Sequence, residues 1–301
     1  MKKAINILII LSLIISMGVI MSSCRRDVEL STSWEVPDYI GEGEVVEGLN
    51  ALEIFDLALE NYYEAEYMVF VRSMDFRAPL ISTTQQTIDI TKCYGDEVFT
   101  QGTKQGSGFG KSHDATRFYY DGANAYELKI RGKDAEQRFP ALEQEDWSDL
   151  TYSEYDDSEK DLETKLEEIR NFTLYVINED TLADDHDNKV YEMDDKYYIC
   201  LTIDCMDIEL GTTQKAVEED IMRGLGDTAK EGTFEWKSNT KLYLEITEID
   251  DKYYITARSL QENYSAVQAV LPVTCDQITS GTYSYDADDA AITDKEKMDK
   301  A

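Results

Sequence analysis

The sequence is poor in histidine and in basic residues. It has 301 residues, with two histidines, His113 and His186, and 29 lysines and arginines against 62 aspartates and glutamates. The formal net charge of −33 leaves no basic face for phosphates, which excludes a nucleic acid as partner. The same charge argues against electrostatic docking on anionic lipid headgroups. Apolar residues make up 42% of the chain, enough for a core, so the chain is not disordered throughout.

The sequence motifs of common hydrolases are also missing. There is no G-x-S-x-G elbow, no H-E-x-x-H and no phosphate-binding loop. Ser112, His113 and Asp114 are adjacent, and adjacent residues cannot converge as a catalytic triad does. Two carboxylates can serve glycoside hydrolysis, but among 62 acidic residues any pair can be found by eye. We therefore expect a protein that is not an enzyme and has no cofactor, with a hydrolase as a minor alternative.

Two segments concentrate acidic residues. One of them holds Asp184, Asp185, Asp187 and Asn188, and the other holds Asp286, Asp288 and Asp289. Calcium prefers oxygen ligands of this kind. Neither segment has the glycine and terminal glutamate of a calcium-binding loop, so both are interpreted as solvated turns and no metal site is expected.

The only long apolar run lies at the N-terminus. Lys2 and Lys3 precede it, it extends over residues 4–21, and small residues then lead to Cys24. This order is typical of a secretion signal, although its length does not exclude a retained spanning helix. The sequence Met-Ser-Ser-Cys resembles the lipobox of bacterial lipoproteins, in which the cysteine is lipidated and becomes the first residue. We expect a signal peptide over 1–23 and an extracytoplasmic protein that lipidated Cys24 anchors to a membrane of the bacterial envelope.

The rest of the chain divides into a tether, a domain and a tail. Residues 24–48 have no apolar period and are expected to form a flexible tether, and residues 284–301 an acidic disordered tail. The domain of residues 49–283 contains four further cysteines, listed here: Cys93, Cys200, Cys205 and Cys275. Outside the cytoplasm they permit two disulfides, and free buried thiols are the equal alternative. Cys200 and Cys205 lie at opposite parity on one strand and should face opposite sides.

Hydrophobic periodicity predicts a domain of strands with few helices. Helices are expected over residues 49–66, with Asn50 as N-cap, over 158–170 and over 213–223. Residues 105–113 and 139–157 are expected to be irregular. Strands are expected over residues 67–74, 81–93, 98–104, 116–120, 125–131, 172–178, 189–193, 197–204, 233–237, 241–249, 253–259 and 264–273.

Three hairpin turns have recognisable sequences. Asp121-Gly122 separates two of the predicted strands, and Asp-Gly is a strong turn signal. The hexapeptide DDKYYI occurs at 194–199 and again at 250–255, each time between two predicted strands. In both copies Asp-Asp-Lys is predicted to make the turn and Tyr-Tyr-Ile to begin the return strand. Because the flanking sequences differ, the two copies indicate two similar hairpins and not a repeat protein.

The order of these elements is similar to that of the LolA-like and LppX-like lipoprotein carriers. The resemblance rests on NALEIFDLALENYYEAEYMVFV, TRFYYDGANAYELK, KYYICLTID, TTQKAVEEDIMRGLG and KLYLEITEIDDKYYITA. It implies an α+β fold, an antiparallel sheet curved into an unclosed half-barrel whose concave face is covered by an N-terminal helix and two inserted helices. It also implies a non-enzymatic protein that binds a lipid or a lipoprotein acyl group.

An acyl ligand would contact apolar strand residues that share one face. The positions expected to line its site are Val69, Val71, Phe118, Leu128, Leu174, Val176, Leu201, Ile203, Leu244 and Ile246. The alternative for each of them is a place in a dry core. A second hypothesis for the whole protein is an envelope adhesion or accessory module that binds protein or glycan through exposed tyrosines and acidic surface. Tyrosine pairs at 62–63, 119–120, 197–198 and 253–254 motivate it, although tyrosine also simply favours strands.

Overall fold

A computed structural model describes residues 34–78, 83–107, 112–136, 152–158, 160–207, 214–225, 229–268, 271–293 and 296–297. The predicted signal peptide, residues 1–23, and Cys24 lie outside the described residues. Within the described ranges, no helix is both long enough and apolar enough to cross a bilayer.

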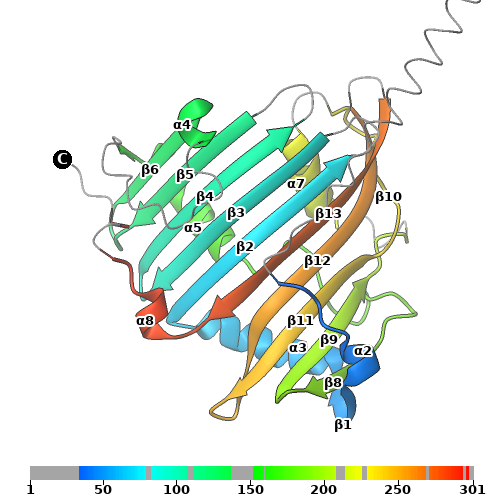
Figure 1. Ribbon diagram of the computed structural model, residues 1–301. Coiled ribbons are helices and arrows are strands. Elements are labelled where there is room, and N and C mark those ends of the chain that lie inside the picture. Colours follow the sequence, from blue (N-terminus) through cyan, green and yellow to red (C-terminus); the bar gives the residue numbers. More distant parts are fainter. Residues whose placement is uncertain are drawn as a thin grey trace, which may run out of the picture.

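One antiparallel sheet of 13 strands organises the chain (Figure 1). Its order is β1 (Glu44–Asn50), β8 (Lys189–Met193), β9 (Lys196–Ile203), β11 (Thr240–Ile249), β12 (Lys252–Gln268), β13 (Leu271–Ser284), β2 (Tyr67–Ala78), β3 (Thr83–Tyr94), β4 (Glu97–Ser107), β5 (Ser112–Tyr120), β6 (Ala125–Arg131) and β7 (Ser153–Glu154). The short β10 (Glu235–Trp236) also pairs with β12. Strands β1 and β7 are the two ends of this order, and no pairing joins them in the described part of the chain. The predicted antiparallel, unclosed sheet is therefore confirmed.

The longer helices lie on one side of the sheet, behind it in Figure 1. They are α3 (Ala51–Glu64), α5 (Leu162–Arg170) and α7 (Lys215–Leu225). All three contribute side chains to the cluster that includes Phe118 and Leu201. We call this the inner face of the sheet and the opposite one the outer face. Asn50 caps α3 as predicted, since its Oδ1 accepts from the backbone N–H of Leu52 at 2.8 Å.

The main core lies between α3 and the β9–β11–β12 part of the inner face. Ile54, Phe55 and Ala58 of α3 are buried there against strand residues. The strand residues Ile199, Leu201, Ile203, Leu242, Leu244 and Ile246 are at most 1% exposed. A layer so completely buried is a packed core and leaves no space for a ligand.

The chain segments predicted to be a tether and a tail cover parts of the outer face. Within 24–48, residues 34–48 are described and form α2 (Tyr39–Glu42) and most of β1. Tyr39 is 2% exposed and stacks on Tyr198 at 5.6 Å between ring centroids. In the predicted tail, α8 (Ala287–Ala290) packs near β2 and β3, and buried Ile292 joins Phe99 in an outer-face cluster. These single buried side chains have no period in the sequence, which is why the boundaries 49 and 283 differ from the structure.

Both DDKYYI copies form hairpin turns as predicted, but each turn consists of the two aspartates alone, because Lys196 and Lys252 already pair as the first residues of the return strands. Asp194 and Asp195 have φ of 55° and 59°, and Asp250 and Asp251 have φ of 52° and 60°. Two successive residues at positive φ define the type I′ turn, whose twist matches that of paired strands. The Asp121-Gly122 hairpin also forms, with Asp121 accepting from the backbone N–H groups of Ala123 and Asn124.

Several other predicted elements differ from the structure. Residues 172–178 form no strand, although their buried and exposed side chains partly alternate. The strands expected over 253–259 and 264–273 are instead one long β12 and the start of β13, because the polar residues between them pair with β13 like the rest. The loop expected over 105–113 is shorter, since β4 extends to Ser107 and β5 begins at Ser112. A short helix, α4 (Lys133–Glu136), also lies beside β5 and β6.

The four described cysteines, Cys93, Cys200, Cys205 and Cys275, are free and buried. Cys200 packs with Tyr39 in the outer-face cluster, whereas Cys205 belongs to the main core. They therefore face opposite sides, as their spacing predicted.

Candidate ligand-binding site

The ten residues expected to line an acyl site do not come together. Five of them belong to the main core: Phe118, Leu201, Ile203, Leu244 and Ile246. All of these except Phe118 are 0% exposed. By strand register, Val69, Val71 and Leu128 belong to the outer face, because Val71 pairs with Ile90 and Leu128 lies opposite Arg117. Leu174 and Val176 are exposed side chains of the segment that is not a strand. The four fully buried residues therefore lie in a dry core, which was the alternative to a place in a ligand site.

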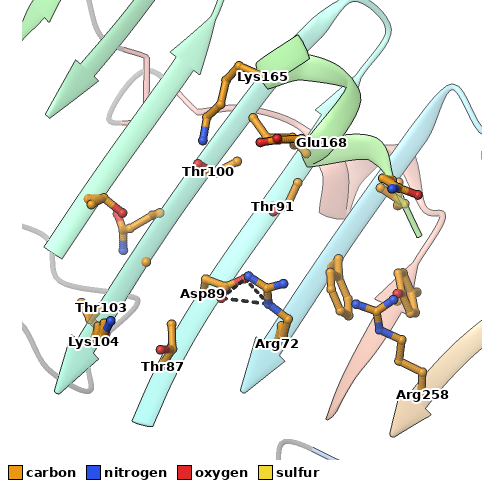
Figure 2. Close-up of a pocket in the computed structure, with 18 of the residues that line it drawn as sticks. Arg72, Thr87, Asp89, Thr91, Thr100, Thr103, Lys104, Lys165, Glu168 and Arg258 are labelled. Carbon is orange, nitrogen blue, oxygen red and sulfur yellow. Dashed lines mark hydrogen bonds and ion pairs between the residues drawn. The ribbon is translucent and has the colours of Figure 1, made fainter. Parts of the chain in front are cut away.

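A polar cavity opens beside this core. It has a volume of about 400 Å³ and lies between the inner face of β2–β5 and α5, with Tyr283 of β13 and Arg258 of β12 at one end (Figure 2). None of the ten expected residues lines it.

The floor of the cavity is one register row of polar residues and glycines. Each member lies opposite the next on the adjacent strand, from Arg258 through Gly281, Arg72, Asp89 and Gly102 to Thr116. Side chains at opposed positions of paired strands project from the same face. Gly102 lines the cavity and keeps its floor low, whereas the ring of Phe70 fills the space above Gly281. A Cβ at Gly281 would lie 2.4 Å from Cε2 of Phe70 and 2.5 Å from the carbonyl oxygen of Val71, so no larger residue fits there.

An ion pair stands in the middle of this row. Arg72 donates from Nε to both carboxylate oxygens of Asp89 at 3.1 and 3.0 Å, and its Nη2 lies 2.9 Å from Oδ2 (Figure 2). The charge of Asp89 raises the pKa of Arg72, against a smaller opposing effect of burial. The two side chains thus fix each other, as expected of a charge-assisted pair with several contacts.

Arg258 is a buried cation at the end of the row. It is 9% exposed, and its guanidinium carbon lies 4.7 Å from the ring centroid of Phe70 and 4.8 Å from that of Phe172. It donates from Nη1 to the carbonyl oxygen of Phe172. Its Nε has no hydrogen-bond partner among the described residues. The two rings hold the guanidinium by cation–π contact, and the Nε–H group is left without an acceptor in the described structure.

Threonines and α5 complete the site. Thr87, Thr91 and Thr100 lie on β3 and β4 beside the row, and their hydroxyls can both donate and accept hydrogen bonds. Lys165 of α5 extends toward Thr100 in Figure 2, with its Nζ 5.7 Å from the ring centroid of Phe118. Burial, and secondly the nearby charge of Lys160, lowers the pKa of the Lys165 amine.

The charges around the cavity are unevenly paired. Its three acidic residues each have an ion-pair partner, Arg72 for Asp89, Arg131 for Asp114 and Lys160 for Glu168. Lys104, Lys165 and Arg258 have no carboxylate within 4.0 Å in the described ranges. A strongly acidic protein therefore presents three cations without ion-pair partners to one small cavity. This lining can form ion pairs and hydrogen bonds with a ligand.

A second cavity, of about 850 Å³, adjoins the first and shares Glu168 and Asn171 with it. It lies between α5 and the ends of the strands, where Tyr63, Val98 and Tyr120 line it.

The other candidate sites remain separate from this one. Within the described residues, no group of three or more histidine, cysteine, aspartate or glutamate side chains is arranged to hold a metal ion. Asp187 accepts from the hydroxyl of Tyr191 at 2.7 Å, and Asp286 caps α8, so both acidic segments take part in local structure. In the pair at 119–120, Tyr119 packs in an outer-face cluster and Tyr120 against the main core, as the alternation of a strand requires.

Comparisons with known proteins add little to this description. No family model and no curated protein matches the sequence. Among solved structures, the chain is similar to an N-terminal dehydratase from the difficidin assembly line, at 10% identity over 80% of this chain and 86% of that one. It is also similar to the dehydratase domain from the CurK module of the curacin polyketide synthase, at 11% identity over 82% and 86% of the two chains. Both TM-scores are 0.13, too low to support an argument about fold or function.

Proposed function

We propose that this protein is a lipid-anchored, extracytoplasmic bacterial binding protein that is not an enzyme, and that its ligand occupies the polar cavity between β2–β5 and α5. In this proposal the sheet is a half-barrel whose concave side is the inner face, and Cys24 carries the anchor. The lipobox-like Met-Ser-Ser-Cys supports the location. The observation that carries the binding role is the cavity itself, with its low floor and three cations without ion-pair partners.

The position of the cavity favours a polar ligand over an acyl chain. An acyl chain needs an apolar wedge between sheet and helices, but on this face the apolar side chains of β9 and β11 are packed against α3. Beside a few apolar side chains such as Met68, Phe70 and Ile169, threonines and charged residues make up most of the lining of the space that remains. Burying hydrocarbon against such groups would leave their hydrogen bonds unmade, at a cost of roughly 1–3 kcal/mol each.

Mass spectrometry of the purified full chain tests this proposal. The protein is purified under native conditions and then denatured, and the released small molecules are identified. We expect a polar molecule from the wild type. We expect none from Thr116→Phe, because the added ring fills a cavity into which Thr116 is exposed.

The matched control is Thr282→Phe, the same change at an exposed position on the outer face of β13. It should release as much ligand as the wild type. An acyl lipid that is released equally from all three proteins would contradict the polar cavity and favour the carrier function. Equal release of a polar molecule from Thr116→Phe would place its site elsewhere.

A further inference from the structure

We propose that the polar cavity binds a small hydroxylated organic anion of the chemical class of acidic sugars. Lys104, Lys165 and Arg258 would attract its anionic group, and the threonines of β3–β5 would bind its hydroxyls. This inference rests on the proposed function, since it takes the cavity to be a ligand site. It adds the charge and the chemical class of the ligand.

The distribution of charge around the cavity favours an anionic ligand. The chain has 62 acidic residues against 29 basic ones, so most cations on such a protein find a carboxylate nearby. Around the cavity the acids are already paired, Asp114 and Glu168 with residues outside its lining. The remaining cations have no carboxylate within 4.0 Å among the described residues, and the proposed anionic ligand supplies one.

The burial of Arg258 also favours an anionic ligand. Taking a guanidinium out of water costs free energy unless its donors are satisfied. Here one nitrogen donates to the carbonyl oxygen of Phe172, while Nε has no partner within the described structure. The rings of Phe70 and Phe172 fix the plane of the group, so little side-chain entropy is lost when it binds an anion. A planar fork of donors held in this way suits a carboxylate.

The threonine hydroxyls that line the cavity favour a hydroxylated ligand. Thr87, Thr91, Thr100 and Thr116 come from three adjacent strands, β3, β4 and β5, and line one side of the cavity. Threonine hydroxyls donate and accept, which matches the hydroxyls of a sugar better than it matches an inorganic anion alone. Phe70 and Tyr283 also line the cavity, in the neighbouring register row, and add apolar surface for the carbon skeleton. The volume of about 400 Å³ limits the ligand to a small molecule.

Isothermal titration calorimetry with glucuronate and glucose tests the inference, because the two sugars differ in the carboxylate. With the full chain in 150 mM sodium chloride, we expect glucuronate to bind at least about tenfold more tightly than glucose. Lys165→Gln should weaken glucuronate binding about tenfold and affect glucose binding less. Arg258→Met, which keeps an unbranched apolar side chain between the rings, should have the same effect. Lys215→Gln on α7, away from this cavity, is the control and should bind like the wild type.

The outcomes separate this inference from the proposed function. Equal affinity for both sugars, with both lost in Thr116→Phe, overturns the anionic ligand and keeps the binding site. Glucuronate binding that Thr116→Phe does not affect overturns both. Inorganic phosphate that binds as tightly as glucuronate overturns the hydroxylated ligand class and leaves only an anion site. If neither sugar binds while another molecule co-purifies with the wild type and not with Thr116→Phe, the sugar class is wrong and the binding site stands.

Discussion

At the residue scale, Glu262 is a buried acid outside the polar cavity. It is 6% exposed, its Oε1 accepts from the hydroxyl of Tyr175 at 2.6 Å, and its Oε2 accepts from Nε2 of Gln277 at 2.8 Å. Burial raises its pKa to about 7, and the two hydrogen bonds oppose that rise. The protonated acid can donate to Tyr175, whose hydroxyl lies 3.3 Å from Oγ1 of Thr240. The network therefore accommodates the neutral form.

This pKa makes stability depend on pH. The folded pKa of about 7 lies above the value of 4.5 taken for an unperturbed glutamate, so the folded state binds the proton more tightly than the unfolded state. The stabilisation is fully present below about pH 4.5 and is lost as the pH rises toward 7 and above. We predict that Glu262→Gln raises the free energy of unfolding at pH 8 by up to about 3 kcal/mol and changes it little near pH 4.5.

Urea denaturation of both proteins at the two pH values measures this difference. Glu60→Gln, at an exposed position of α3, is the control and should follow the wild type at both values. A variant that is less stable than the wild type at pH 8 would mean that the ionised carboxylate is favoured in the network.

Neither Glu262 nor Arg258 could be identified from the sequence. Among 62 acids and 29 bases, nothing local distinguishes the buried ones. Their burial follows from the length of β12, which continues through polar residues because β13 pairs with it from Ala257 to Gln268. The threonines of β3 can be read from the sequence, but which of them face the cavity depends on the strand pairing that places Arg72 opposite Asp89.

At the element scale, the two Asp-Asp turns combine an accurate sequence signal with a strained backbone. Aspartate tolerates positive φ better than most residues, yet the left-handed region still costs it energy, and glycine is preferred at the second position of a type I′ turn. We predict that Asp251→Gly raises the free energy of unfolding by about 0.5–1 kcal/mol, the relief of strain exceeding the entropy cost of glycine. Thermal or urea unfolding of the variant measures it.

The companion substitution is Asp251→Ala, which keeps the backbone at φ near 60° and loses the tolerance of aspartate for it. It should lower the free energy of unfolding by about 1 kcal/mol. If glycine destabilised the hairpin or alanine stabilised it, strain in this turn would not be what limits its stability.

Elements that depend on local patterns were predictable, and those that depend on distant partners were not. The hairpins and the cap of α3 rest on neighbours in sequence, and they form as expected. Residues 172–178 have strand-like composition but pair with no strand, and their buried Phe172 and Tyr175 contact Arg258 and Glu262 instead. Propensity is overridden there by tertiary contacts.

At the scale of the whole molecule, the net charge of −33 destabilises the compact state by self-repulsion. Salt screens this repulsion, since the Debye length falls from about 30 Å at 0.01 M to about 8 Å at 0.15 M. We predict that raising sodium chloride over this range stabilises the protein by about 1 kcal/mol, a rise of about 2–4 °C in Tm. Differential scanning calorimetry measures it, with sulfate avoided because it stabilises proteins by exclusion from their surface.

The control is the same salt series near pH 4.2, the isoelectric point of the sequence. With little net charge left, salt should have little effect there. An equal rise in Tm at both pH values would show that screening of net charge is not its cause.

The unclosed antiparallel sheet was predictable as a class, but the order of its strands was not. Strand β13 lies between β12 and β2, so the last strand of the sheet in sequence pairs with one of the first. No local pattern specifies such a pairing, and it is this pairing that brings Arg72 and Arg258 into one row.

That register row has a consequence for folding kinetics. Gly281 pairs with Arg72 and with Arg258, so the row is complete only after the chain between residues 72 and 281 has closed into a loop. Contacts between residues so distant in sequence form slowly, because the entropy of loop closure is lost before the contacts stabilise the fold. During synthesis the strands β2–β5 emerge long before β13. We therefore expect ligand binding to appear among the last events of refolding, after most of the secondary structure has formed.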